Sequence, residues 1–167
     1  MVGDHNVLMT AFAAVFDSTT GALHYANAGQ NFPYVMKLGA QRVIGNASII
    51  AASGNPLGDR NIAVEIRRGE LQLSPGDVFV CFTDGVVERA NKSGKLFGDR
   101  RLRNALTGQA VPDRHSLVRV RDAVLAAVER HAEGTQVGDD ITFVLCQFDP
   151  PAESTTMSGS GVGRGAA

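Results

Sequence analysis

Two short runs of continuous apolar residues, each bordered by aspartate, constrain the fold of this chain most strongly. VFVCFT occupies positions 78–83 between Asp77 and Asp84, and ITFVLCQF occupies positions 141–148 directly after Asp139 and Asp140. Short apolar runs of this kind, rich in valine and phenylalanine and bounded by turn-forming residues, are typical of strands buried inside a sheet. We therefore predict two buried strands, one near the middle of the chain and one near its end.

The chain before the first run has the pattern of antiparallel strands. Segments 8–17 and 22–28 are joined by the turn-forming group DSTTG, in which Gly21 can adopt a positive φ, and together they predict a β-hairpin. Apolar and polar residues alternate on both sides of Gly69 in segment 62–73, which predicts strands with one solvent-exposed face. Further short strands are expected at 34–38, around 42–44 and at 48–51.

Two helices are expected between the two apolar runs. One covers 99–106. The longer one covers 113–132, where apolar residues recur at offsets of three and four on one face (Leu117, Val120, Val124 and Val128). Asp113 is the expected N-cap of the longer helix, and Gly134 is its expected stop.

This order of elements predicts an α+β layered fold rather than a parallel βαβ one, because antiparallel strands come first and the helices follow. We expect one domain over 1–149. Residues 150–167 (PPAESTTMSGSGVGRGAA) are too poor in apolar side chains to offset the entropy of ordering. We expect a disordered tail there.

Composition excludes several classes of protein. With 16 Lys and Arg against 17 Asp and Glu, the formal charge is −1, so no basic field is present to hold a nucleic acid. The two cysteines, Cys81 and Cys146, lie within apolar runs and do not suggest a disulfide framework. No stretch is long enough for a membrane helix and the start lacks the features of a signal peptide, so we expect a cytoplasmic protein.

Acidic residues stand where the two predicted strands end. If the strands are antiparallel neighbours, Asp84 and the pair Asp139 and Asp140 meet at one edge of the sheet. Carboxylates gathered there would repel one another unless a cation lay between them, and Mg²⁺ or Mn²⁺ suits oxygen ligands without nearby His or Cys. Gly85 would leave room beside such an ion. The alternative is that TDG and GDD are simple turns, since Asp and Gly are common turn residues.

Taken together, several segments decide between these alternatives by resemblance. MTAFAAVFDSTTGALHYANAGQNFP, SGNPLG, TDGVVERANKSGKLFG and GDDIT, in this order, resemble the C-terminal part of a SpoIIE-type (RsbU-like) serine/threonine phosphatase domain of the PPM superfamily, over about residues 9–148. The resemblance implies an αββα sandwich that is incomplete at its N-terminus. It also implies that Asp84 and Asp139 are metal ligands, with Gly85 and Asp140 in supporting positions.

The resemblance further implies a reaction and a partner. Two Mg²⁺ or Mn²⁺ ions in the complete family domain would activate water for attack on the phosphorus of phosphoserine or phosphothreonine, with no Ser or Cys nucleophile. The expected substrate is a regulatory phosphoprotein such as a STAS-domain anti-sigma-factor antagonist. A partner chain, including a second copy in a homodimer, could cover sheet edges that the missing N-terminal strands would leave open.

The first of two departures from the family pattern favours a second hypothesis. The family carries an N-terminal Gly-Asp motif whose Asp bridges both metals, and the early Gly3-Asp4 lacks the strand and spacing of that motif. The second departure is Gln30, which stands where the family commonly has His and cannot titrate near neutral pH. This change is neutral if the loop only shapes the rim of the site, and it lowers activity if the family's His assists catalysis. The alternative function is therefore a non-catalytic interaction module that keeps the phosphatase scaffold without a full metal site.

The remaining polar residues give weaker signals. The histidines lack the spacing of metal ligands and are expected at the surface or at helix ends (His5, His24, His115 and His131). Six arginines make the helical region basic, as either a solvated face or a docking site for an acidic partner (Arg100, Arg101, Arg103, Arg114, Arg119 and Arg121). Segment 53–58, SGNPLG, lacks the lysine of a P-loop and is expected to be a loop near the site.

Overall fold

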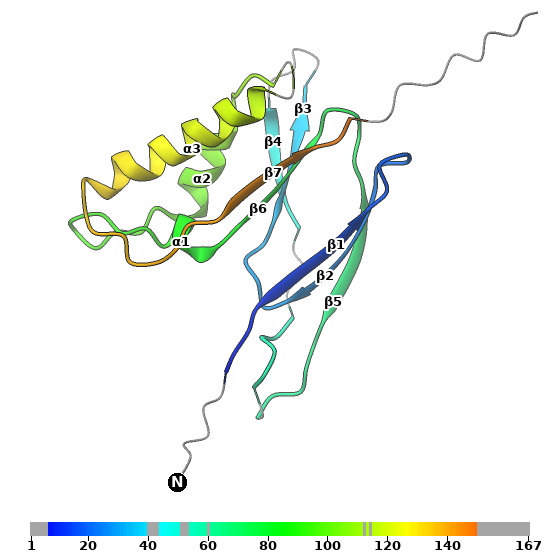
Figure 1. Cartoon of the computed structure of the whole chain (residues 1–167), viewed down its shortest axis with the longest axis horizontal. Helices are drawn as coiled ribbons and strands as arrows, with labels where there is room; N and C mark the ends of the chain where they lie inside the picture. Colours follow the sequence, from blue (N-terminus) through cyan, green and yellow to red (C-terminus); the bar gives the residue numbers. More distant parts are fainter. Residues whose placement is uncertain are drawn as a thin grey trace, which may run out of the picture.

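The chain folds into two antiparallel sheets and a helical layer (Figure 1). The computed structural model describes residues 7–39, 44–50, 54–59, 61–111, 113 and 115–149. The predicted tail, Gly3-Asp4, His5, Arg114 and Ser53 lie outside this part of the chain. In order, the elements are β1 (Ala11–Phe16), β2 (Ala22–Ala28), β3 (Tyr34–Leu38), β4 (Ile44–Ile49), β5 (Arg67–Gln72), β6 (Val78–Phe82), α1 (Asp84–Val87), α2 (Gly98–Leu106), α3 (Ser116–Ala132) and β7 (Phe143–Gln147).

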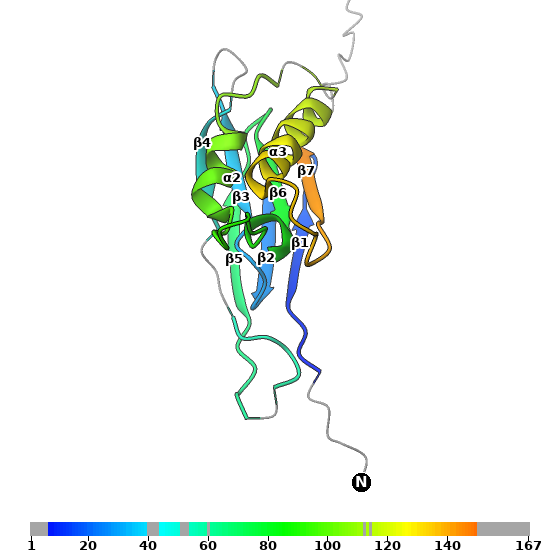
Figure 2. The same cartoon turned by 90° about the vertical axis from the view of Figure 1, so that its left-hand side faces the viewer.

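The helices and the two sheets form successive layers in Figure 1, and Figure 2 looks onto the helices with the sheets behind them. The three-stranded sheet has the order β1-β2-β5, and the four-stranded sheet has the order β4-β3-β6-β7. Helices α2 and α3 cover the face of the four-stranded sheet that points away from the other sheet. The expected α+β layering is therefore confirmed, with one helical layer among the described residues.

The two apolar cores explain why the run at 78–82 is continuous. Val78, Val80 and Phe82 on β6 face the helices, where they pack with Val120 and Val124 of α3 among others. Phe79 faces the other sheet and packs there with side chains such as Leu23. Because β6 is buried on both faces, nearly every side chain along it has to be apolar.

Both β-strands that the apolar runs predict are present, and they are neighbours, but only β6 is buried. The prediction of a buried strand at 141–148 was wrong, because β7 lies at the edge of the sheet, where Val144 is 44% exposed and Cys146 is also exposed. β6 and β7 pair antiparallel, with Val78 opposite Gln147 and Phe82 opposite Phe143. The hairpin of β1 and β2 and the strand β3 also lie where the sequence predicts them. In α3, Val120, Val124 and Val128 are the buried stripe.

Two strand predictions need correction. The weaker pair around 42–44 and 48–51 is a single strand, β4, with residues 42, 43 and 51 outside the described part. Segment 62–73 forms one strand only over Arg67–Gln72, and that strand continues through Gly69 because the ring of Tyr25 on β2 occupies the space above the glycine. Among the described residues no strand pairs with 62–66; instead the backbone N–H of Asn55 donates to the Glu65 carbonyl oxygen at 2.8 Å.

The helix ends differ slightly from expectation. α3 begins at Ser116 rather than at 113, but Asp113 still accepts a hydrogen bond from the Ser116 N–H at 3.0 Å, which is the contact that a cap makes with a first turn. At the other end, Glu133 and Gly134 both have positive φ and end the helix. The one-turn helix α1 was not predicted, because four residues are too short to show a helical period.

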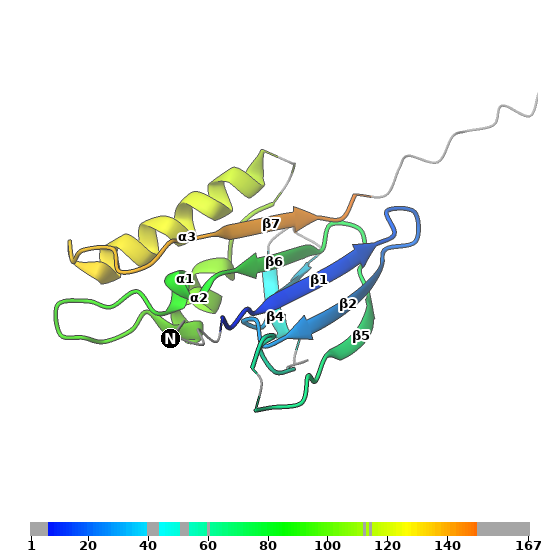
Figure 3. The same ribbon diagram turned by 60° about the horizontal axis from the view of Figure 1, so that its bottom comes forward.

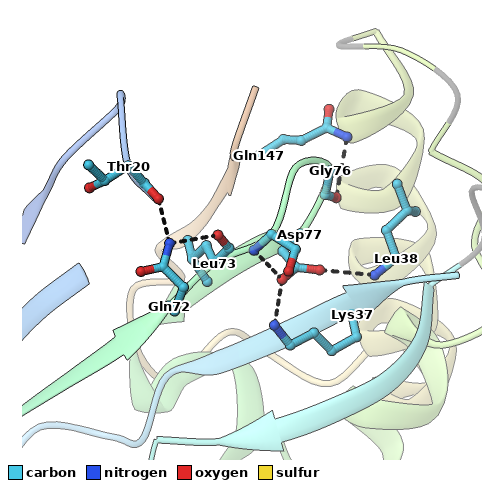
Figure 4. Close-up of polar contacts among 9 residues, drawn as sticks. Thr20, Lys37, Leu38, Gln72, Leu73, Gly76, Asp77 and Gln147 are labelled. Carbon is cyan, nitrogen blue, oxygen red and sulfur yellow. Dashed lines mark hydrogen bonds and ion pairs between the residues drawn. The ribbon is translucent and has the colours of Figure 1, made fainter. Parts of the chain in front are cut away.

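A buried aspartate directly before β6 forms hydrogen bonds that stabilise the start of this strand (Figure 4). Asp77 is 2% exposed, and its carboxylate accepts hydrogen bonds from the Ser74 N–H at 2.9 Å, the Leu38 N–H at 3.3 Å and the ammonium of Lys37. Gln147 donates to the nearby Gly76 carbonyl oxygen. These contacts hold β3, β6 and β7 together at one end of the sheet and leave the other end, where Asp84 lies, for the candidate site.

Candidate metal centre

The two acidic motifs lie side by side at one edge of the four-stranded sheet. Pairing of β6 with β7 extends past Phe82, because the Thr83 N–H donates to the Thr142 carbonyl oxygen at 3.0 Å. Asp84 follows as the first residue of α1, and Asp139 lies three residues before Thr142. Figure 3 shows α1 beside the segment that leads into β7.

Thr83 joins the two motifs through its side chain. Its hydroxyl donates to the Asp140 carbonyl oxygen at 3.1 Å and accepts from the Thr142 N–H at 2.9 Å. Thr83 occupies the N-cap position of α1 without making a capping bond to that helix. Sequence reasoning missed this residue; a threonine directly before a helix start would have suggested a cap, but not a bond to another strand.

Gly85 permits the close approach of the two segments. It is buried, and a Cβ placed on it would lie 2.4 Å from the Asp140 carbonyl oxygen and 3.4 Å from that of Asp139. No side chain fits at the first of these distances. The space that the glycine leaves is thus filled by the backbone of the Asp139–Asp140 segment.

Asp84 and Asp139 have the same local arrangement. The Oδ1 atom of Asp84 accepts from the Gly85 N–H at 3.0 Å, and the Oδ1 atom of Asp139 accepts from the Asp140 N–H at 2.8 Å. Both side chains are exposed, as is that of Asp140. Each carboxylate therefore keeps its Oδ2 atom without a hydrogen bond inside the described part of the chain.

A cleft of about 420 Å³ opens beside these residues. Asp139 and Gly85 line it, together with Glu88 and Arg89 from the end of α1. Glu88 adds a carboxylate that the sequence analysis did not single out, although it belongs to the TDGVVERAN motif. Within the described ranges, no group of three or more His, Cys, Asp or Glu side chains is arranged to hold a metal ion.

Gln30 ties the two sheets together close to this edge. Its side-chain amide donates to the Phe82 carbonyl oxygen at 3.4 Å, and its Oε1 atom accepts from the Thr10 hydroxyl at 2.6 Å. Its backbone N–H donates to Asn27 Oδ1 at 2.8 Å. The residue that departs from the family pattern thus contacts the strand that leads to Asp84.

The loop at 54–58 lies against the loop that carries Gln30. A Cβ on Gly29 would lie 2.8 Å from Pro56, so the two loops touch. Both line a second cleft, of about 430 Å³, that also reaches Val87 of α1. The described part of SGNPLG is a loop beside α1.

The other polar candidates lie elsewhere. His24 forms an exposed ion pair with Glu70 at 3.5 Å, His131 contacts the Lys95 carbonyl oxygen at 2.8 Å, and His115 precedes α3. The described arginines of α2 and α3 lie on those two helices (Arg100, Arg101, Arg103, Arg119 and Arg121). Burial, and to a lesser extent the neighbouring Cys146 thiol, raise the pKa of the Cys81 thiol to about 12, so this thiol stays protonated near neutral pH.

Comparison with solved structures defines the class of protein. The SiaA-PP2C domain of Pseudomonas aeruginosa is similar with a TM-score of 0.63 and 25% sequence identity, covering 78% of this chain and 48% of that one. The phosphatase domain of SpoIIE from Bacillus subtilis is similar with a TM-score of 0.60 and 16% identity, covering 84% and 56%. The fold is therefore that of a PP2C phosphatase domain, of which this chain represents a part.

The family follows from the sequence. The family model for stage II sporulation protein E (SpoIIE) matches residues 2–149, and the chain belongs to that family, a family of PPM-type protein phosphatases. Protein IcfG of Synechocystis sp. is 23% identical over 142 residues, which are 85% of this chain and 21% of that protein. The chain spans about a fifth of the length of IcfG and about half of the two solved domains. No helix among the described residues is long and apolar enough to cross a membrane.

Proposed function

We propose that this chain supplies two metal ligands, Asp84 and Asp139, to a phosphatase that hydrolyses phosphoserine or phosphothreonine on a protein. The observation that carries the proposal is the pairing of Thr83 with Thr142, which puts the two acidic motifs of a phosphatase family at one edge of one sheet. Family membership favours this enzyme over the non-catalytic interaction module.

The donor set fits a hard divalent cation. Asp84 and Asp139 offer exposed carboxylate oxygens, and no His or Cys lines the adjacent cleft. Mg²⁺ commonly keeps several waters and needs only one or two protein carboxylates, and Mn²⁺ accepts the same oxygen ligands. We propose that Asp84 and Asp139 hold Mg²⁺ or Mn²⁺ there; in the complete family domain the number of ions is two.

Each residue at the proposed metal site has a distinct role. When bound, the cations supply the Lewis acid that activates water and neutralises charge during attack on phosphorus. Asp84 and Asp139 bring negative oxygens from two segments to one place. Gly85 allows those segments to touch, and Asp140 fixes their separation because its carbonyl oxygen accepts the Thr83 hydroxyl.

The substrate proposal rests on the family resemblance. We propose a phosphorylated regulatory protein, such as a STAS-domain anti-sigma-factor antagonist, and we place the reaction in the cytoplasm. The arginines of α2 and α3 could contact an acidic face of such a protein, or they could simply be solvated.

The experiment is turnover of a phosphoserine peptide with added Mn²⁺, comparing this chain with Asp84→Asn and Asp139→Asn. Each substitution removes a charge but keeps the shape of the side chain, so we expect at least a tenfold loss of Mn²⁺-dependent turnover in each, as with loss of a metal contact. Asp122→Asn on α3 is the matched control and should keep full turnover. Equal turnover by all four chains, or none by the unaltered chain, would contradict the proposal.

A further inference from the structure

A buried arginine joins the segment after α1 to the segment after α3. Arg89 is 6% exposed, and its guanidinium donates to the carbonyl oxygens of Thr135 and Gln136, which lie 46 and 47 positions later in the chain. The two acceptors are consecutive, so both terminal nitrogens of the guanidinium are engaged by one stretch of backbone. This fork fixes the position of that stretch in two directions.

A second contact runs in the opposite direction. The Thr135 hydroxyl donates to the Ala90 carbonyl oxygen at 2.8 Å. We call the contacts of Arg89 and Thr135 together the Arg89 latch. The hairpin over 90–96 also contacts the end of α3, because the His131 ring lies within hydrogen-bond distance of the Lys95 carbonyl oxygen. Figure 3 shows the two segments running beside each other.

Packing alone does not account for an arginine at this position. Burying a guanidinium is costly unless its charge is compensated, and within the described ranges no carboxylate forms an ion pair with Arg89. Its Nε atom is buried without a hydrogen-bond partner. An apolar side chain of similar volume would avoid this cost, but it could not bind two backbone carbonyl groups.

The latch joins two segments that each carry a proposed metal ligand close by in the sequence. Arg89 follows Asp84 by five residues, and Gln136 precedes Asp139 by three. Arg89 and Asp139 line the same cleft. Because the loop between α3 and β7 is otherwise exposed over Gln136–Asp140, the latch is the contact that orders the approach to Asp139 from the α3 side.

We propose that Arg89 is a positioning residue that holds the loop carrying Asp139 in register with the turn carrying Asp84. The proposal rests on the proposed metal site, because only then does the separation of the two aspartates matter for function. In this role Arg89 acts through the backbone of Thr135 and Gln136, to which its guanidinium donates.

Hydrogen–deuterium exchange tests the ordering of the loop without any metal. In Arg89→Met the amides of Thr135 and Thr142, which donate to the Ala132 carbonyl oxygen and the Thr83 hydroxyl at the two ends of the loop, should exchange about tenfold faster. This corresponds to a loss of about 1.4 kcal/mol of local stability. Arg89→Lys keeps the charge but not the two-pronged guanidinium. Its exchange rates at the same amides should lie between those of Arg89→Met and those of the unaltered chain. Thr135→Val removes only the second contact and should give a smaller increase in the same amides.

Mn²⁺-dependent thermal stabilisation tests the link to the metal site. The Mn²⁺ concentration that gives half of the stabilisation should rise about tenfold in Arg89→Met, as for loss of an outer contact to a metal ligand. Arg121→Met is the matched control, since among the described residues Arg121 bonds only the neighbouring Asp122 on the exposed face of α3. The Mn²⁺ concentration at half stabilisation should not change in Arg121→Met.

The outcomes separate the two proposals. Unchanged exchange at Thr135 and Thr142 in Arg89→Met, or an increase spread evenly over the chain, would overturn the latch. An unchanged Mn²⁺ midpoint with faster exchange would overturn its role at the metal site. If the unaltered chain itself shows no Mn²⁺ stabilisation, the proposed function fails, and the positioning role fails with it. Should Arg89→Met not fold, Arg89→Lys and Thr135→Val carry the same comparisons.

Discussion

At the scale of single residues, the Thr83 hydroxyl is the group that couples the two acidic motifs. Replacing it with a methyl group in Thr83→Val removes the bonds to Asp140 and Thr142 while keeping the volume and β-branching of the side chain. We expect a loss of about 1–2 kcal/mol in the free energy of unfolding, measured by urea denaturation, since each net hydrogen bond contributes about 1 kcal/mol.

Two variants control for this prediction. Thr83→Ser keeps the hydroxyl and should retain most of the stability. Thr142→Val makes the same chemical change on an exposed side chain and should stay within about 0.5 kcal/mol of the unaltered chain. Equal losses in Thr83→Val and Thr142→Val would show that the cross-strand hydroxyl bonds are not what holds the motifs together.

The residues that could be predicted at this scale are those with a local signal. Asp84 and Asp139 flank apolar runs, and their meeting at one edge requires only that the runs be antiparallel neighbours. Thr83 and Arg89 carry no such signal, because their partners lie 46 to 59 positions away and only the folded chain brings them into contact.

At the scale of elements, Gly69 makes the clearest prediction. Its partner across the sheet is Tyr25, whose ring lies over the glycine and stacks on Phe12 with 5.9 Å between ring centroids. A Cβ at position 69 would lie 2.3 Å from the Tyr25 hydroxyl oxygen. Gly69→Val should therefore destabilise the chain by about 1–3 kcal/mol in urea denaturation, although valine has the higher strand propensity.

The neighbouring position on the same strand provides the control. Arg68 is exposed on the other face of β5, where valine has room, and Arg68→Val should change stability by less than about 0.5 kcal/mol. If Gly69→Val is as stable as Arg68→Val, the ring of Tyr25 does not explain why the strand continues through a glycine.

The elements that could be predicted are those with a sustained period or a long apolar run. The stripe on α3 and the runs of β6 and β7 are of this kind. The error at 62–66 arose where alternation alone was the signal, because alternation does not tell whether a partner strand is available. Helix α1 was missed because a single turn has no period.

At the scale of the whole molecule, one side of the sandwich is open. In the described part of the chain β1 pairs only with β2 and β7 only with β6, and two cavities lie between these edges, one lined by Phe12 and Val144 and one by Phe16 and Cys146. Open strand edges and uncovered apolar side chains are sites for further pairing. The layers could be predicted from the order of elements, but the order of strands could not, apart from the pairings of β1 with β2 and of β6 with β7.

The proposed metal centre requires that Asp84 and Asp139 share a divalent cation. The most direct measurement is the loss of amide signals in ¹⁵N-labelled chain as Mn²⁺ is added, because the paramagnetic ion broadens only nearby nuclei. The amides of Gly85 and Asp140 should weaken together at the same Mn²⁺ concentration, and both should be spared in Asp139→Asn at that concentration. Broadening of one segment without the other, or of neither while exposed aspartates such as Asp122 respond, would contradict the claim.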